Sequence, residues 1–159
     1  MAKGDTSRDL HLEDGKGIIS HVNEYNYFGV KINKDGNHEP EINDGINRGR
    51  AAITKRNSIL WDRDVTPKTK THIYHATVKS TITYVAETWC LKAKTVGKLN
   101  STEMDFWRRS ARISRKEKIR KNIIKRKMNV TKFLLDDIKT KRLQWHGHVQ
   151  RMEEGRLPK

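Results

Sequence analysis

The sequence predicts a mostly α-helical protein, in which a helical, bundle-like segment follows a short two-stranded β piece and a disordered N-terminal tail. Apolar residues recur with a helical period from Glu39 onward, whereas β-branched and aromatic residues gather just before it. The first fifteen residues are polar and show neither pattern. These observations divide the chain into a tail at 1–15, a β piece at 16–36, a first set of helices at 37–92 and a basic helical region at 93–159.

The composition predicts a thin core and a polyanionic partner. Of the 159 residues, 34% are apolar and 33% are charged, and the net charge is +15. Because such a charge opposes compaction of the free protein, it favours binding to a polyanion. Nucleic acid is the leading class, since phosphate neutralisation releases condensed counterions. An acidic membrane surface is the competing class, but it requires a broad apolar face opposite the cations.

The β piece is expected to contain two strands. Gly17–Val22 and Tyr25–Ile32 are rich in β-branched and aromatic residues, and Asn33–Asn37 has the composition of a turn. Two strands alone are marginally stable, so we interpret them as the edge of a larger sheet.

Helical spacing begins at Glu39. The first helix is expected to reach Leu60, and Gly45 and Gly49 should each weaken it by up to about 1 kcal/mol relative to alanine. Its inner stripe consists of Ile42, Ile46, Gly49, Ile53 and Leu60. Thr66 and Pro67 then provide an N-cap followed by a proline at the first helical position. The second helix is expected to run to about Cys90, with Ile73, Thr77, Ile82 (or Thr81) and Tyr84 facing inward.

Three further helices are expected in the basic region. Thr95 is the predicted cap of a third helix, whose inner residues are Val96, Leu99, Glu103, Phe106, Trp107 and Ser110. Ser114 to Glu117 match a capping box that would begin a fourth helix holding Ile119, Ile123 and Ile124. Thr131 is the predicted cap of a fifth helix, with Leu134, Leu135, Ile138, Trp145, Val149 and Met152 on one side.

Positive charge is concentrated between Asp105 and Lys132, where twelve Lys and Arg face only two acidic residues. A solvated helix face usually alternates charge, because opposite pairs four residues apart stabilise it and like pairs do not. The run therefore predicts phosphate binding, while a nuclear-localisation signal and a plain solvated surface are the alternatives. The candidate nucleic-acid-binding residues are Arg108, Arg109, Arg112, Arg115, Lys116, Lys118, Arg120, Lys121, Lys125, Arg126 and Lys127.

Phe106 and Trp107 adjoin these cations. They could stack on bases, but packing in the core is favoured.

No catalytic or metal-binding constellation is predicted. Asp136 and Asp137 follow two leucines, as in a polymerase site, but they fall at the start of a predicted helix rather than in a hairpin between strands. His146 and His148 point to different sides of a helix, and His72 and His75 have no further ligands nearby in sequence. We therefore expect neither catalytic residues nor a cofactor in this chain.

The expected compartment is nuclear or cytoplasmic. Cys90 is the single cysteine, so no internal disulfide can form, and a reduced setting fits. Neither a secretion signal nor a membrane span is visible in the sequence, so we expect no secretion and no membrane partner.

Four elements from Tyr25 onward resemble the endonuclease–reverse transcriptases of non-LTR (LINE-type) retrotransposons. Tyr27–Ile32 resembles the strand that follows their catalytic palm, and Ile42–Leu60 the helix after it. Tyr84–Trp89 resembles their tyrosine-x-x-glutamate-x-tryptophan element. Leu143–Met152 is similar to their tryptophan-x-glycine-histidine-valine-x-arginine-methionine element, which Arg156–Lys159 continues. The family's order and spacing are kept over about 135 residues.

The resemblance implies a piece of an RNA-directed DNA polymerase, the thumb-like region downstream of the palm. Its partners would be RNA, DNA or an RNA–DNA hybrid, together with the polymerase palm. The family's magnesium-binding aspartate pair precedes the Tyr27 strand and has no matching position here, so Mg²⁺ is implied only for the complete polymerase. Phe28, Gly45 and His146 depart from the family's usual residues, which indicates drift.

Two other interpretations remain open at this point. The fourth and fifth predicted helices could form an independent helix-turn-helix-like module that binds DNA or RNA. The chain could also be a relic without a function. Sequence-selective binding at physiological salt would favour the module, whereas sequence-blind binding with a steep salt dependence would favour a thumb-like role.

Overall fold

A computed structural model describes residues 10–11, 18–19 and 22–152 of the chain. The chain divides into two units, Met1–His38 and Glu39–Lys159, and each is described by itself. Within the described residues, the first unit contains only strands and the second only helices. The predicted fold class, mostly α with a short β piece before the helices, is therefore confirmed.

The first unit holds two antiparallel strand pairs. Strand β1 (Leu10–His11) pairs with β2 (Ile18–Ile19), and β3 (Glu24–Tyr27) pairs with β4 (Val30–Asn33). The tail predicted at 1–15 lies outside the described residues, apart from the two residues of β1.

The predicted single strand at Tyr25–Ile32 is wrong, because this segment is a hairpin. Phe28 and Gly29 have φ angles of 47° and 76°, and they connect Tyr27 to its pairing partner Val30. Two consecutive positive φ angles define the turn that joins tightly twisted antiparallel strands. The predicted turn after β4 is present, with Gly36 N–H donating to the carbonyl of Asn33 at 3.1 Å.

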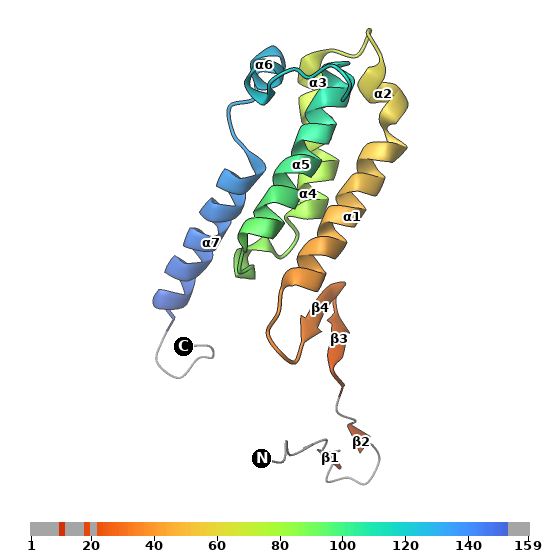
Figure 1. Ribbon diagram of the computed structural model, residues 1–159. Coiled ribbons are helices and arrows are strands. Elements are labelled where there is room, and N and C mark those ends of the chain that lie inside the picture. The colour runs from red at the N-terminus through yellow and green to blue at the C-terminus, as the bar shows by residue number, and fades with distance from the viewer. Residues whose placement is uncertain (1–9, 12–17, 20–21, 153–159) are drawn as a thin grey trace. The chain divides into compact units, whose positions relative to one another are not determined.

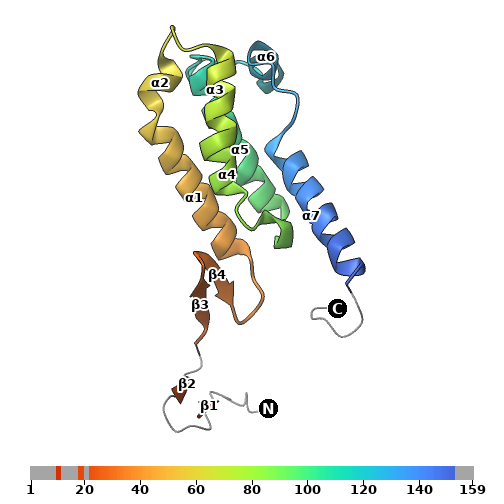
Figure 2. The same ribbon diagram turned by 180° about the vertical axis from the view of Figure 1, so that it is seen from behind.

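The second unit is a bundle of helices (Figures 1 and 2). α1 packs against α5, η1 and α4, while α7 packs against α5 and η2. The elements are α1 (Glu39–Lys55), α2 (Asn57–Trp61), α3 (Pro67–Ile73), the π-helical η1 (Tyr74–Lys79), α4 (Ser80–Ile82), the 3-10 turn η2 (Ala86–Thr88), α5 (Ala93–Ser110), α6 (Lys121–Lys127) and α7 (Leu134–Gln150).

One buried core joins the two predicted helical regions. The stripe predicted for the first helix is confirmed, because its isoleucines and Leu60 are buried. Phe106 and Trp107 are also buried, and both rings contact Tyr74, with centroids 5.0 and 4.6 Å away. The alternative in which Phe106 and Trp107 stack on bases is therefore wrong.

The two glycines of α1 allow close packing of α4. A Cβ at Gly49 would lie 2.4 Å from Ile82 Cγ1, and one at Gly45 would lie 3.4 Å from the Ile82 carbonyl oxygen and 3.7 Å from the Trp89 ring. The glycines that the sequence marks as weak points of the helix are thus contact points of the bundle. Gly45 has a packing role that the interpretation as drift did not foresee.

The second predicted helix ends earlier than expected. Tyr74, Val78 and Ile82 face the core at intervals of four residues, and the inward placement of Ile82 is confirmed. The inward placement of Tyr84 is wrong, since this residue is 49% exposed. The regular spacing stops because the helix ends at Ile82 and Val85 takes a left-handed φ of 58°.

The hydroxyl-rich part of this helix is π-helical rather than regular α-helix. The Thr77 side chain donates to the Ile73 carbonyl at 2.6 Å, and the Thr81 side chain donates to the Thr77 carbonyl at 2.6 Å. Hydroxyls that bond back to carbonyls four residues earlier compete with the backbone ladder and bend helices. They account for threonine being tolerated along a helix that the sequence alone could mistake for a strand.

Of the three threonines predicted as caps, one is confirmed. The Thr66 hydroxyl accepts the Thr69 N–H at 3.2 Å at the start of α3. Thr95 lies inside α5 instead of preceding it, and its hydroxyl accepts the Lys92 N–H at 3.0 Å. Thr131 does not cap α7, which starts at Leu134.

We expect Thr66→Ala to lower the free energy of unfolding by about 1 kcal/mol, because the Thr69 N–H loses its acceptor. The measurement is the midpoint of a urea titration. Thr54→Ala is the matched control: Thr54 is exposed within α1, so the same substitution should be neutral or slightly stabilising there. Equal losses in both variants would contradict the assignment of the cap.

The observed fourth helix starts later than predicted and is shorter than predicted. The capping interaction is half formed, with Ser114 N–H donating to Glu117 Oε1 at 2.7 Å, yet helix α6 begins only at Lys121. Ile124 is buried as predicted, but Ile123 is 54% exposed. Like charges within one turn destabilise a helix over residues 114–120. The carbonyls of Ser114 and Ile119 accept hydrogen bonds from the Arg108 side chain instead.

Candidate nucleic-acid interface

The predicted basic surface covers the last turns of α5, the irregular segment 111–120 and α6, at one end of the bundle (Figure 1). Its cations fall into two groups. Some are bound within the protein, and others face solvent without a partner in the part of the chain that the structure describes. The division matters because only the second group has all of its donors free for phosphates.

Arg108 is bound by the segment that follows its own helix. Its guanidinium donates to the carbonyls of Ser114 at 3.4 Å and Ile119 at 2.8 Å. A side chain from α5 thus holds both ends of the stretch that was expected to be helical. Arg108 was predicted to contact nucleic acid, but in the structure its guanidinium stabilises the segment from Ser114 to Ile119.

Two arginines share one carboxylate. Arg109 lies 3.0 Å and Arg115 lies 2.7 Å from the Asp105 carboxylate, and Arg109 also donates to Asn57 Oδ1 at 2.7 Å. Arg115 nevertheless has a side chain that is 75% exposed. The acidic residues of the region are therefore occupied, since Glu117 accepts the Ser114 N–H.

Two lysines of α6 are also held by the protein. The Lys125 ammonium lies 3.3 Å from the centroid of the Phe133 ring, a cation–π contact. The Lys127 ammonium donates to the Ala111 carbonyl at 3.1 Å, just after the C-terminal end of α5. A cation there is favoured by the negative end of the helix dipole.

The remaining predicted residues form what we call the free basic set. Each is exposed, and none has a side-chain hydrogen bond or ion pair within the described ranges. The set consists of Arg112, Lys116, Lys118, Arg120, Lys121 and Arg126.

Sequence reasoning missed one cation at this end of the bundle. Lys70 is 3% exposed, and its ammonium donates to the carbonyls of Asp62 at 2.7 Å and Ser110 at 3.3 Å. Burial and the nearby Arg112 guanidinium lower the pKa of Lys70, against the opposing influence of Asp62. The signal was present in the sequence, because Lys70 begins the four-residue spacing that continues through Tyr74.

Glu103 of α5 links its own helix to η1 and to α7. Its Oε1 accepts the Tyr74 hydroxyl at 3.1 Å, the Trp107 indole N–H at 3.4 Å and the Leu134 backbone N–H at 3.2 Å. Burial and the Glu103 carboxyl group raise the pKa of Tyr74 far above its usual value. Glu103 therefore fixes the first residue of α7 to the aromatic core.

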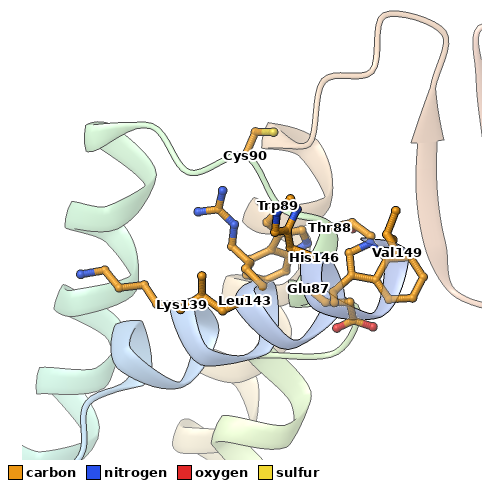
Figure 3. A pocket seen from close by; sticks show the side chains of 10 residues that line it. Glu87, Thr88, Trp89, Cys90, Lys139, Leu143, His146 and Val149 are labelled. Atoms are coloured by element: carbon orange, nitrogen blue, oxygen red, sulfur yellow. The ribbon is translucent and has the colours of Figure 1, made fainter. Parts of the chain in front are cut away.

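Two of the resemblance-carrying elements meet in a second region. The 84–89 and 143–152 elements come together where α7 packs on η2, and they line an open groove of about 730 Å³ (Figure 3). Trp89 is buried there, and its indole nitrogen has no hydrogen-bond partner among the described residues. The other lining residues are Glu87, Thr88, Cys90, Lys139, Arg142, Leu143, Trp145, His146 and Val149.

The side chains of Asp136 and Asp137 both form contacts within the protein. The Asp136 side chain accepts the Phe133 N–H at 3.4 Å, and Asp137 forms an ion pair with Lys79. Both lie in the first turn of α7, and they do not fit a two-metal polymerase site. Nowhere in the described ranges do three His, Cys, Asp or Glu side chains gather as metal ligands would.

Each helix in the described part of the chain is too short or too polar to span a bilayer.

Comparison with known proteins finds one informative similarity. The chain is 27% identical over 158 residues to a transposon-derived protein of Caenorhabditis elegans whose own function is uncharacterised. The match covers 96% of this chain and 53% of that protein, so the chain spans about half the length of its relative. The similarity connects the chain with transposon-derived sequence. Neither a protein-family model nor a solved structure matches it.

Proposed function

We propose that the chain is a nucleic-acid-binding segment of a non-LTR retrotransposon reverse transcriptase and does not polymerise DNA by itself. The observation that carries the proposal is the free basic set, which clusters within residues 112–126 while Asp105 and Glu117 are engaged elsewhere. Like charges left unpaired at this density repel one another, and a phosphate backbone would relieve that repulsion.

Two further observations support the source of the segment. The relative in Caenorhabditis elegans is transposon-derived, and the two tryptophan-containing elements that resemble reverse transcriptases pack against each other. In the proposed role, the helices lie against a primer–template duplex of RNA and DNA. Magnesium and its carboxylate ligands would then belong to the palm of the complete polymerase, which we propose as the protein partner.

Binding should be sequence-blind and strongly salt-dependent. If about six phosphates are neutralised, the logarithm of the association constant should fall against the logarithm of salt concentration with a slope of about −5 on duplex DNA. Fluorescence anisotropy with an RNA–DNA hybrid, duplex DNA and single strands measures both affinity and slope. Tight, sequence-selective binding at physiological salt would instead favour the helix-turn-helix-like module.

Neutralising part of the free basic set is expected to weaken duplex binding at low salt by about 100-fold or more and to reduce the slope by about 4. The variant carries Lys116→Gln, Lys118→Gln, Arg120→Gln and Lys121→Gln, all at exposed positions, so the fold should be kept. The readout is the same anisotropy titration over a range of salt concentrations.

A second variant separates location from total charge. It carries Lys34→Gln, Lys55→Gln, Lys68→Gln and Lys139→Gln, which remove the same charge from exposed positions elsewhere. This control should keep most of the affinity and slope. Equal losses in the two variants would mean that binding depends only on net charge, and the assignment of the interface would then be wrong. Magnesium-dependent primer extension by the chain alone would refute its proposed inactivity.

A further inference from the structure

A small, partly open cavity lies at the C-terminal end of α5, and Arg112 of the free basic set is one of its lining residues. Its volume is about 90 Å³, and it is lined by residues from the loop before α3, from α3 itself, from the end of α5 and from the end of α6. Since one water molecule needs roughly 10–15 Å³ of this kind of cavity volume, the space is large enough for a tetrahedral oxyanion. The polar side chains that line it are Arg63, Lys70, Ser110, Arg112 and Lys127.

The lining offers hydrogen-bond donors that the protein leaves unused. An ammonium group has three donors, and that of Lys70 uses two on backbone carbonyls, while that of Lys127 uses one. The Ser110 hydroxyl is buried and has no partner. Arg63 and Arg112 are exposed, with no guanidinium contact among the described residues.

Carboxylates are absent from the same walls, whose backbone carbonyls at Ser110 and Ala111 already accept from Lys70 and Lys127. Asp62 lies close enough to raise the pKa of Lys70, but burial and Arg112 outweigh it, and its Oδ1 accepts the Asp64 N–H at 2.9 Å. Two exposed guanidinium groups, unused ammonium donors and an unpartnered buried hydroxyl together give this cavity the chemistry of an anion site.

We propose that this cavity binds a single phosphate group, with Arg112, Ser110 and Lys70 as its main donors. The proposal rests on the proposed function for the source of the phosphate, a nucleic-acid strand lying on the free basic set. It goes beyond that function because it assigns one built site, with defined donors, within a surface that otherwise attracts phosphates by charge alone. The bound group would accept the third Lys70 N–H and the Ser110 hydroxyl.

Two substitutions remove donors without disturbing the fold. Ser110→Ala deletes a buried hydroxyl that has no partner, so stability should be unchanged or slightly raised. Arg112 has a φ of 59°, a left-handed conformation that asparagine tolerates well, so Arg112→Asn removes the cation and keeps the backbone. Lys139→Gln is the matched control, because it removes an exposed cation that neither lines the cavity nor belongs to the free basic set.

Isothermal titration calorimetry with inorganic phosphate, at ionic strength held constant with chloride, tests the site. The wild-type chain should bind one phosphate, Ser110→Ala and Arg112→Asn should each weaken binding about ten-fold, and Lys139→Gln should change it less than two-fold. Thermal melting of each variant verifies that the fold is kept. Absence of saturable phosphate binding, or equal affinity in all the variants, would overturn the proposal.

Oligonucleotides then distinguish the source of the phosphate. Strands with a 5′-phosphate or a 5′-hydroxyl are titrated into the wild-type chain and Arg112→Asn. A loss confined to the phosphorylated strand identifies a terminal phosphate, and an equal loss on both identifies an internal phosphodiester. If phosphate binds the cavity but the wild-type chain binds no oligonucleotide, the proposed function fails and the anion site stands.

Discussion

Replacing Glu103 with leucine is expected to destabilise the protein by about 3–5 kcal/mol, the largest effect that we expect of any single substitution. One buried carboxylate oxygen accepts hydrogen bonds from Tyr74, Trp107 and Leu134. Leucine accepts none, so a hydroxyl, an indole N–H and the first backbone N–H of α7 would remain buried without partners. The free energy of unfolding, measured by urea titration, reports the loss.

Glu103→Gln is the control for this prediction. The amide oxygen of glutamine can still accept from at least two of the three donors, so this variant should lose much less stability than the leucine variant. A leucine variant that unfolds within about 1 kcal/mol of the wild type would show that α7 does not depend on Glu103.

The second large effect is expected at Gly49. Helix propensity alone predicts that Gly49→Ala stabilises α1 by about 1 kcal/mol. The structure predicts the opposite sign, because the new Cβ would lie 2.4 Å from Ile82 Cγ1 and 2.6 Å from Ile82 Cδ1. Overpacking of this kind costs about 1–3 kcal/mol, so we expect a net loss in the free energy of unfolding.

Gly97 is the matched glycine, because a Cβ there would meet nothing within 4 Å inside α5. Gly97→Ala should therefore show the stabilisation that Gly49→Ala does not. Ile82→Ala should remove the clash, so the double variant with Gly49→Ala should be more stable than the sum of the two single effects predicts. Strict additivity of the two substitutions would refute the proposed contact between α1 and α4.

Periodicity was enough to predict the inner faces of the long helices. Ile42, Ile46 and Ile53 in α1, and Leu99 and Phe106 in α5, follow a regular spacing and are buried in the core. Such stripes are reliable because every residue of a regular helix keeps its angular relation to the next. The Tyr84 prediction was wrong because that relation ends where Val85 takes a positive φ.

Local signals were insufficient where a distant group competed with them. Ser114 to Glu117 match a capping box, but Arg108 binds the carbonyls of Ser114 and Ile119 and the chain stays irregular. In the same way, a sequence shows a cluster of cations. It does not show which of these cations form ion pairs with carboxylates or hydrogen bonds with carbonyls. Phosphate binding stays a prediction, both for the free basic set and for the larger set of candidate residues that the sequence indicates.

The polar contacts between α1 and α5 fix how the bundle must assemble. Lys98 donates to Asn43 and Arg50 donates to Thr102, so the two helices run parallel, and these partners are 55 and 52 residues apart in the chain. Tyr74 and Glu103 are separated by only 29 residues. Yet loop-closure entropy grows so slowly with length that the difference amounts to about 0.5 kcal/mol. The entropic cost of forming the two kinds of contact is therefore nearly equal, and the bundle is expected to fold in one cooperative step.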